Sequence, residues 1–293
     1  MEHQELPKLE EHFLTGSMWH IFRKGNPYEI IDTYETLRNI FGYDLFYVNF
    51  GFWTEGLTTE EPGRELTYVI GDALGLSTGQ RVFEGGSGLG QAAIDNCLRY
   101  DLASVKGYNV CAPQVNFANA LAKSYGLQDK IEHKLEDACQ AVEQFSFGEI
   151  DHAYAQECIG HFPDPLQFLK GVYSALPNGG RMAITFVSSP NPPSKLLAMV
   201  QNFYFGCRAR SGKEWESIMT DAGFKIVESR DITDMVFVPM FEFIRKRLRE
   251  KPESFDFSWT MRSGMKILLS QSEKGVKNNT MGYHLVVGEK VSK

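Results

Sequence analysis

Residues 81–90 read RVFEGGSGLG: a short apolar strand, an acidic residue at Glu84, and a turn built mostly from glycine. Residues 91–100 follow with helical spacing. A glycine turn between a strand and a helix lets a ligand approach the backbone closely, and it leaves free N–H groups at the start of the helix beside that ligand. The stretch therefore predicts the nucleotide-binding end of a doubly wound α/β domain, with a nucleoside-containing cofactor.

The glycines can be aligned in two ways. In the first, Gly88, Gly90 and Ala93 form the G-x-G-x-x-A pattern of a dinucleotide site. That alignment leaves Glu84 unexplained. An NAD site also expects an acidic residue at the end of the next strand, where this chain has Asn109.

The second alignment takes the acid and the alternating glycines as one unit, E-x-G-x-G-x-G, over residues 84–90. This unit resembles the first motif of S-adenosylmethionine-dependent methyltransferases, in which the loop passes under the methionine part of the cofactor with the acid close by. A carboxylate and a dipole-lined loop suit the mixed charges of that cofactor. The resemblance implies S-adenosylmethionine as the cofactor, bound by Glu84, Gly86, Gly88 and Gly90.

Two later strand ends extend the resemblance. Residues 107–115 resemble the second-strand motif, with Asn109 where most relatives carry an acid that holds the ribose; an amide can still accept and donate a hydrogen bond. Residues 135–138 resemble the third motif, whose acid meets the adenine, although Asp137 also fits a helix N-cap. The further cofactor-binding residues that the resemblance implies are Asn109, Val110, Gln114, Asp137, Ala138 and Gln156.

Residues 153–164, AYAQECIGHFPD, resemble the corresponding stretch of sterol C-methyltransferases and related small-molecule enzymes. A strand that ends in Gln156 and Glu157, with His161 four residues on, lies at the carboxyl edge of the predicted sheet, where open α/β sheets hold ligands. An acceptor with a proton to lose needs a base, and Glu157 and His161 are the catalytic candidates. The alternative is that Glu157 only orients the cofactor or a neighbouring turn.

Strands and helices alternate along the rest of the chain. This order predicts a Rossmann-like core over residues 80–293, with a mostly parallel sheet covered on both faces and right-handed crossovers. The expected strands are 81–84, 104–110, 131–135, 150–155, 181–187, 225–229 and 282–288, and the expected helices are 89–100, 113–125, 166–175 and 213–222. The resemblance implies that the last strand is antiparallel and inserted at the edge of the sheet.

Residues 1–79 lie outside this core and are expected to form a helical cap segment. Residues 6–23 and 27–41 have helical apolar spacing. Residues 43–53 are dense in aromatic side chains and resemble the N-x-G-Y-W segment that small-molecule methyltransferases fold over their cofactor. The resemblance makes Trp53 a candidate to contact the sulfonium through a cation–π interaction, and packing beneath the two helices is the alternative.

Two insertions, near residues 188–212 and 232–277, are rich in Phe, Met and Leu. In the family, insertions at these places build a lid over the acceptor, and an apolar lid suits an apolar or aromatic acceptor. The same composition would also suit the contact face of a homodimer.

The composition of the chain argues against several classes of binding partner and site. The net charge of −7 argues against an enzyme held by nucleic-acid phosphates, and no apolar run approaches the roughly 20 residues of a membrane span. The acidic N-terminal stretch does not resemble a signal peptide. Five cysteines without C-x-x-C spacing indicate reduced thiols in a cytoplasmic protein and no metal site.

Together these features predict an S-adenosylmethionine-dependent methyltransferase that acts on a small, apolar or aromatic metabolite. Carbon methylation of a sterol-like or terpenoid-like acceptor is favoured, and oxygen or nitrogen methylation of a secondary metabolite is the alternative within the class. Two other classes stay open: an NAD-linked oxidoreductase, and a scaffold that binds the cofactor without methyl transfer.

Overall fold

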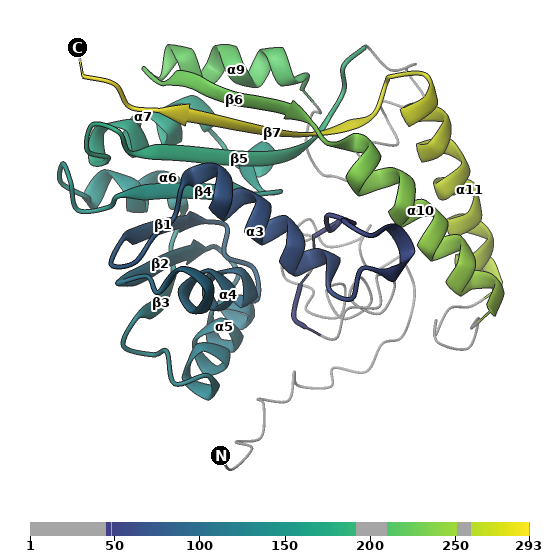
Figure 1. Ribbon diagram of the computed structural model, residues 1–293, viewed down its shortest axis with the longest axis horizontal. Coiled ribbons are helices and arrows are strands. Elements are labelled where there is room, and N and C mark those ends of the chain that lie inside the picture. Colours follow the sequence, from purple (N-terminus) through teal and green to yellow (C-terminus); the bar gives the residue numbers. More distant parts are fainter. Residues whose placement is uncertain (1–44, 48, 192–209, 251–258, 293) are drawn as a thin grey trace.

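The computed structural model describes residues 45–47, 49–191, 210–250 and 259–292. The helices predicted at 6–23 and 27–41, and most of the first insertion, lie outside these residues. Within the described chain the elements follow the order of an α/β domain (Figure 1). The strands are β1 (Arg81–Gly85), β2 (Ser104–Asn109), β3 (Ile131–Leu135), β4 (His152–Gln156), β5 (Arg181–Ser188), β6 (Lys225–Asp231) and β7 (Gly282–Glu289).

The strands form one seven-stranded sheet in the order β3-β2-β1-β4-β5-β7-β6. Neighbours from β3 through β5 are parallel, so the chain crosses from strand to strand through helices. Because the strand order reverses between β1 and β4, the carboxyl ends of these two strands diverge into a crevice, where such sheets hold ligands. The doubly wound, Rossmann-like, mostly parallel sheet predicted from the sequence is confirmed.

The last strand departs in one respect from the expected arrangement. β7 is antiparallel, as predicted, but it lies between β5 and β6 and pairs with both, so β6 is the edge strand. β7 carries apolar residues on both faces and is buried on both, whereas β6 has a largely exposed pattern. Burial of its two apolar faces explains why β7 occupies the inner position.

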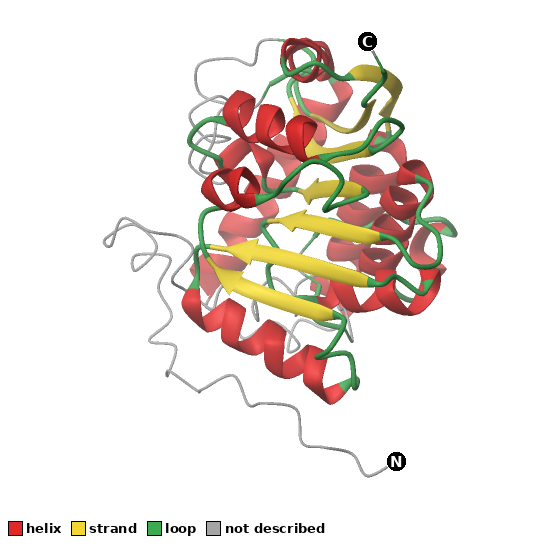
Figure 2. Ribbon diagram, turned by 90° about the vertical axis from the view of Figure 1, so that its left-hand side faces the viewer, coloured by secondary structure: helices red, strands yellow, loops and turns green. Residues whose placement is uncertain are grey.

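Helices cover both faces of the sheet (Figure 2). One face carries α3 (Pro62–Leu74), α4 (Gln91–Tyr100) and α5 (Ala112–Ser124), and the other carries α6 (Ala138–Ala141), α7 (Pro165–Ala175) and α9 (Gly212–Asp221). Four of these helices and all seven strands were predicted, with ends that differ by no more than two residues. Helix α4 begins two residues late because Gly90 has a φ of +83°, which is incompatible with a helix.

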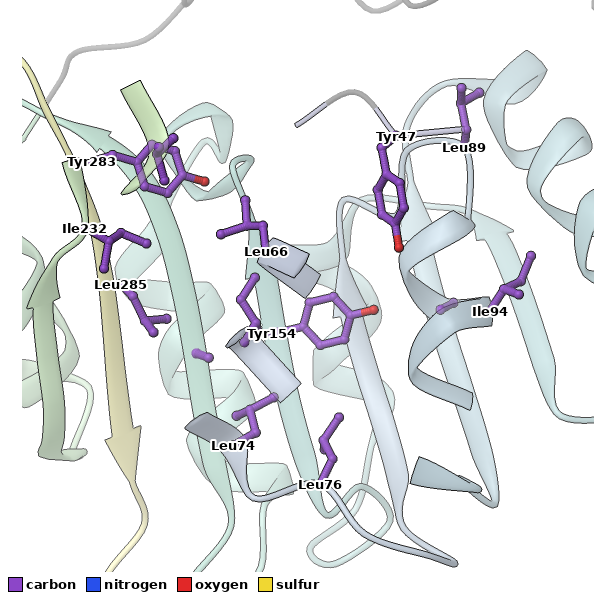
Figure 3. Packing of buried hydrophobic residues seen from close by; sticks show 14 of the residues in the cluster. Tyr47, Leu66, Leu74, Leu76, Leu89, Ile94, Tyr154, Ile232, Tyr283 and Leu285 are labelled. Carbon is purple, nitrogen blue, oxygen red and sulfur yellow. The ribbon is translucent and has the colours of Figure 1, made fainter. Parts of the chain in front are cut away.

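Side chains that alternate along the strands supply two separate hydrophobic clusters. Val82 faces the cluster under α3, α4 and α5, while its neighbour Phe83 faces the cluster under α6, α7 and α9. In β7, Leu285 belongs to the first cluster and Val286 to the second. Figure 3 shows the first cluster, in which Leu66 packs with residues from several strands. Each face of the sheet therefore has its own core.

The sequence analysis missed helix α3, which lies in the segment assigned to the cap. Pro62 occupies its first turn, and Gly75 ends it in the left-handed conformation with a φ of +72°. Both are ordinary signals of a helix start and stop. The buried apolar side chains of α3 belong to the first cluster, together with Leu285 of β7, and the helix packs on the sheet beside α4.

The second insertion consists of two helices, α10 (Thr233–Glu250) and α11 (Trp259–Lys277). They lie side by side at one end of the molecule, joined by the ion pair of Arg245 with Glu273 (Figure 1). The buried face of α10 packs on β7 and on η2 (Gly56–Thr58). Among the described residues, none from α10 or α11 lines the cavity described below.

Candidate active site

A cavity of about 360 Å³ opens at the carboxyl ends of β1, β2 and β4. Its size lies near the lower end of the range for small-molecule sites. All the predicted site residues except Trp53 line it. They are Glu84, Gly86, Gly88, Gly90, Asn109, Val110, Gln114, Asp137, Ala138, Gln156, Glu157 and His161. The fold therefore gathers residues from four strand ends, far apart in the sequence, around one space.

The glycine loop forms the floor of this cavity. Gly86, Gly88 and Gly90 all have positive φ, at +74°, +52° and +83°. A Cβ on Gly86 would lie 2.5 Å from the Cys158 Sγ, and one on Gly90 would lie 2.7 Å from the Ala118 Cβ. These two glycines are required both by the backbone conformation and by the close approach of neighbours.

Glu84 lies at the end of β1 and is almost fully buried, with 3% of its surface exposed. Its Oε2 has no hydrogen-bond partner among the described residues. Burial raises the pKa of this carboxyl to about 8, and the nearby Tyr154 hydroxyl offsets part of that increase. A buried carboxyl oxygen without a partner is costly unless a ligand supplies a donor or a positive charge.

Three glutamine side chains show the same arrangement around the cavity: one amide atom is held by the protein, and the other is buried without a described partner. Gln91 donates to Asp95 (3.4 Å), Gln114 accepts from Asn109 (2.7 Å), and Gln156 accepts from Thr67 (3.3 Å). The unpaired atoms are Gln91 Oε1, Gln114 Nε2 and Gln156 Nε2. Residues that line the cavity thus carry one buried amide acceptor and two buried amide donors without described partners.

Asn109 is engaged on both sides of its amide. Its Nδ2 donates to the Gln114 Oε1 and, at 3.4 Å, to the Gly88 carbonyl, and its Oδ1 accepts from the Cys111 N–H. The side chain that presents an unpaired polar atom at this end of the cavity is therefore Gln114. Asn109 holds it in place.

Asp137 is a helix cap, as one of the two interpretations of this residue expected. Its carboxylate accepts from the Cys139 N–H at the start of α6, at 2.8 Å. It also lines the cavity, so the cap and the ligand interpretations are compatible. Val110, which lines the same part of the cavity, is 56% exposed, an unusual position for an apolar side chain and one that a ligand ring could cover.

Glu157 follows β4 and has a φ of +59°, a strained conformation for a residue with a side chain. Its Oε1 accepts from the Phe50 N–H (2.9 Å) and from the Tyr283 hydroxyl (2.6 Å). Burial raises the pKa of Glu157 to about 7, and these two donors offset part of the increase. A carboxylate with such a pKa can exchange a proton near neutral pH.

His161 ends the short helix η4 (Ile159–His161), four residues after Glu157. Burial lowers the pKa of its imidazole below the ordinary value, so the ring is neutral at pH 7. A neutral imidazole presents one donor and one acceptor nitrogen. The two catalytic candidates therefore line one cavity, in protonation states compatible with accepting a proton.

Trp53 does not line the cavity, which corrects the prediction made for it. The side chain is buried, its indole N–H donates to the Phe50 carbonyl, and its ring packs on Phe243 of α10. The aromatic residues of the same segment that do line the cavity are Phe46 and Tyr47. The segment was correctly expected beside the cofactor loop, but the indole faces the core because α10 packs against it.

Several further residues line the cavity. Asn49 holds the segment by donating to the Gly63 carbonyl and accepting from the Gly51 N–H. The N-x-G spacing around residue 49 was a signal for it. The others, which lie within or beside the quoted motifs, are Leu89, Gln91, Ala92, Tyr108, Glu136, Cys158, Phe162 and Pro163.

The described residues also bear on two other classes of site. No group of three or more His, Cys, Asp or Glu side chains there is arranged to hold a metal ion. None of the helices described combines the length and the apolar character that a membrane span requires.

The sequence model of a methyltransferase domain matches residues 60–229, more than half of the chain. The chain belongs to this methyltransferase family. The match begins just before α3 and ends in β6, so it covers the glycine loop and all the strand ends that line the cavity.

Curated relatives of this methyltransferase span most of its length. Methyltransferase GfsG of Streptomyces halstedii is 27% identical over 253 residues, covering 80% of this chain and 87% of its own. Erythromycin 3''-O-methyltransferase of Saccharopolyspora erythraea is 23% identical and covers 92% of both chains. The methyltransferase is thus an enzyme of the class that uses S-adenosylmethionine on small molecules.

Solved structures share the fold. Phosphoethanolamine N-methyltransferase 2 of Haemonchus contortus, in complex with S-adenosylhomocysteine, has a TM-score of 0.74 at 19% identity, covering 89% of this chain and 58% of that one. The cyclase SpnF has a TM-score of 0.69 at 19% identity, covering 88% and 93%. At these identities the likeness concerns the fold alone.

The cavity suits the cofactor of the family, S-adenosylmethionine. The Glu84 carboxyl and the Gln91 carbonyl are buried acceptors without described partners, which suit an ammonium or a hydroxyl donor. Gln114 and Gln156 present N–H groups that suit hydroxyl or carboxylate oxygens. When bound, the cofactor supplies a methyl group activated by its sulfonium. The NAD alternative is not favoured, because it needs an acid in place of Asn109.

Proposed function

We propose that this methyltransferase transfers the methyl group to a hydroxyl oxygen of an uncharged, largely apolar metabolite, with Glu157 as the general base. The observation that carries the proposal is the Glu157 carboxylate, which lines the cofactor cavity. Two donors from other elements hold its Oε1, and its pKa is about 7. His161, neutral and in the same cavity, is the second polar group that would hold or deprotonate the hydroxyl.

The charges around the cavity support an acceptor without phosphate groups. Among the described residues that line it, none is a lysine or an arginine, while Glu84, Glu136, Asp137 and Glu157 are acidic. A phosphorylated acceptor would need cationic partners there. Curated relatives named as O-methyltransferases, such as O-methyltransferase resE of Aspergillus sclerotiorum, add support for oxygen as the methylated atom.

In the proposed reaction the acceptor oxygen forms a bond to the methyl carbon while the carbon–sulfur bond breaks, and the hydroxyl proton passes to Glu157. The protein holds the oxygen in line with the methyl group and excludes water from it. Phe46, Tyr47 and Phe162 surround the cavity and would provide the apolar wall. General-base catalysis of this kind contributes about 100-fold to 10,000-fold.

Carbon methylation, favoured by the sequence resemblance, is the second candidate. Adding a methyl cation to an alkene produces a carbocation, which aromatic rings stabilise and a base then deprotonates. Phe46, Tyr47, Tyr108 and Phe162 all line the cavity, and Glu157 would serve as that base. Because aromatic rings line the cavity, the experiment described next tests carbon methylation as well.

A pair of matched acceptors separates the two candidates. Geraniol offers a hydroxyl and an alkene without charge, whereas geranyl diphosphate offers the alkene with a charged group. We expect transfer from methyl-labelled S-adenosylmethionine to geraniol or to a simple phenol, with an ether as the product by mass spectrometry and NMR. Transfer to geranyl diphosphate alone, at carbon, would refute oxygen methylation.

Variants then test the roles of the two residues. Glu157→Gln should lower kcat/KM by about 100-fold or more, and His161→Ala should lower turnover far more than cofactor affinity. In both variants the Kd for S-adenosylhomocysteine should stay within about twofold of the wild-type value. Equal losses of turnover and of cofactor affinity would reduce these residues to a binding role.

A further inference from the structure

Asp95, in the second turn of α4, receives hydrogen bonds from three different elements. The Tyr47 hydroxyl donates to its Oδ2, the Arg64 Nε of α3 lies 3.3 Å from the same oxygen, and the Gln91 Nε2 donates to its Oδ1 at 3.4 Å. Only 4% of the Asp95 surface is exposed. Asp95 does not line the cavity, yet two of its three donors, Gln91 and Tyr47, do.

The orientation of the Gln91 amide follows from this contact. A carboxylate can only accept hydrogen bonds, so the amide nitrogen must face Asp95 and the carbonyl oxygen must face away. That Oε1 is buried and has no partner among the described residues, and Gln91 is 2% exposed. An unpaired buried carbonyl is unfavourable, and a donor from a bound ligand would recover that loss.

The kind of donor follows from the neighbouring groups. Gln91 and Glu84 flank the glycine loop, both line the cavity, and each carries a buried acceptor atom without a described partner. Two acceptors together, one of them a carboxyl, favour a cationic donor. In S-adenosylmethionine that donor is the ammonium of the amino-acid end.

The other oxygen of Asp95 holds the segment 45–53. Phe46, Tyr47 and Asn49 of this segment line the cavity, so the segment forms one of its walls. Figure 3 shows Tyr47 reaching from that segment toward α4, with its hydroxyl directed at the helix. The Asp95 carboxylate therefore contacts both Gln91, beside the glycine loop, and Tyr47, in the cavity wall.

We propose that Asp95 is a positioning residue that couples recognition of the amino-acid end of the cofactor, through Gln91, to the position of the described residues 45–47 and 49–53 beside it, through Tyr47. The inference depends on cofactor binding and not on the identity of the acceptor or the methylated atom. Loss of Asp95 would weaken the binding of ligands that carry the amino-acid end and would uncouple the segment from the ligand.

The chain offers a control in Asp72, whose side chain is exposed where that of Asp95 is buried. Asp72 also joins α3 to α4, accepting from the Tyr100 hydroxyl (2.6 Å) and from Arg99 (3.3 Å), but it lies outside the cavity. By calorimetry, Asp95→Asn should raise the Kd for S-adenosylhomocysteine about tenfold and leave that for methylthioadenosine, which lacks the amino-acid end, within about twofold. Asp72→Asn should leave both within about twofold. An unchanged Kd in Asp95→Asn, or equal losses for the two ligands, would overturn the proposal.

Hydrogen exchange supplies a readout that a general loss of stability would not reproduce. In the wild type and in Asp72→Asn, S-adenosylhomocysteine should slow amide exchange in residues 45–53. In Asp95→Asn, saturating ligand should no longer do so. Protection of the segment at wild-type level in ligand-saturated Asp95→Asn would refute the coupling.

Two milder variants test the same coupling if Asp95→Asn does not fold. Gln91→Met and Tyr47→Phe should each weaken S-adenosylhomocysteine binding, and their combination should weaken it by less than the product of the two effects, because both act through one carboxylate. Effects that multiply would show that Gln91 and Tyr47 act independently and would overturn the proposal.

Discussion

At the scale of single residues, the site contains buried polar atoms without described partners, which a bound ligand could satisfy. Glu84 is the clearest case: its Oε2 is buried without a described partner, and its pKa is raised to about 8. In the free protein the carboxyl is therefore largely neutral at pH 7. A cationic ligand stabilises the ionised form, so binding should release the proton.

This expectation gives a pH dependence with a definite sign. Between pH 6 and pH 8, affinity for S-adenosylhomocysteine should rise with pH, because a growing fraction of Glu84 is already ionised. Calorimetry at pH 7 in buffers of different ionisation enthalpy should show release of up to about one proton for each ligand bound. Glu84→Gln should bind more weakly and release correspondingly fewer protons. Equal proton release by the two proteins would exclude Glu84 as the source.

At the scale of elements, one carboxylate oxygen joins three parts of the chain. Glu157 ends β4, the Phe50 N–H belongs to the segment 45–53, and the Tyr283 hydroxyl comes from β7. The central strand, the cavity wall and the antiparallel strand thus meet at the proposed base. Hydrogen bonds to an ionised carboxylate lower its pKa, so these contacts counter the effect of burial.

Removing one of these donors should shift the activity profile in a predictable direction. In Tyr283→Phe the pKa of Glu157 should rise above its value of about 7. The base would then be ionised only at higher pH, and the acidic limb of the kcat/KM profile should move to higher pH. Tyr173→Phe, on α7, is the control and should leave the limb in place. An acidic limb that does not move in Tyr283→Phe would show that the limb does not report the ionisation of Glu157.

At the scale of the whole molecule, the hydrophobic clusters on the two faces of the sheet differ in whether they contact the segment that lines the cavity. The first cluster, which lies under α3, α4 and α5, also includes Phe237 of α10. The Phe237 ring packs against Phe50 (5.4 Å between centroids) and Tyr283 (5.6 Å). It therefore supports the segment 45–53 directly. The cluster on the opposite face of the sheet includes Phe224, which packs on Tyr173.

This difference predicts that equal losses of stability have unequal consequences. Phe237→Ala and Phe224→Ala should each lower the free energy of unfolding by about 3–5 kcal/mol, as measured by urea denaturation. Only Phe237→Ala should also weaken S-adenosylhomocysteine binding and speed amide exchange in residues 45–53. The same effect of both variants on the segment would mean that it responds to global stability alone.

The sequence by itself determined the succession of strands and helices along the chain, the glycine loop and most of the residues that line the cavity. These features depend on local chemistry: apolar strands, glycines at positive φ, and polar residues where parallel strands end. Because the carboxyl ends of parallel strands meet at one edge, Glu84, Asn109 and Gln156 could be placed together without coordinates. The same local logic would have found α3, since Pro62 and Gly75 mark its ends.

The tertiary structure alone decided which side chains face the cavity and which hold others in place. Trp53 turns into the core because α10 supplies Phe243 against its ring, leaving Phe46 and Tyr47 at the cavity. Asp95 and Tyr283 act through contacts 48 and 126 residues apart in the chain, which no local pattern reports. Side-chain direction depends on packing against distant elements, so it emerges only once the whole chain is folded.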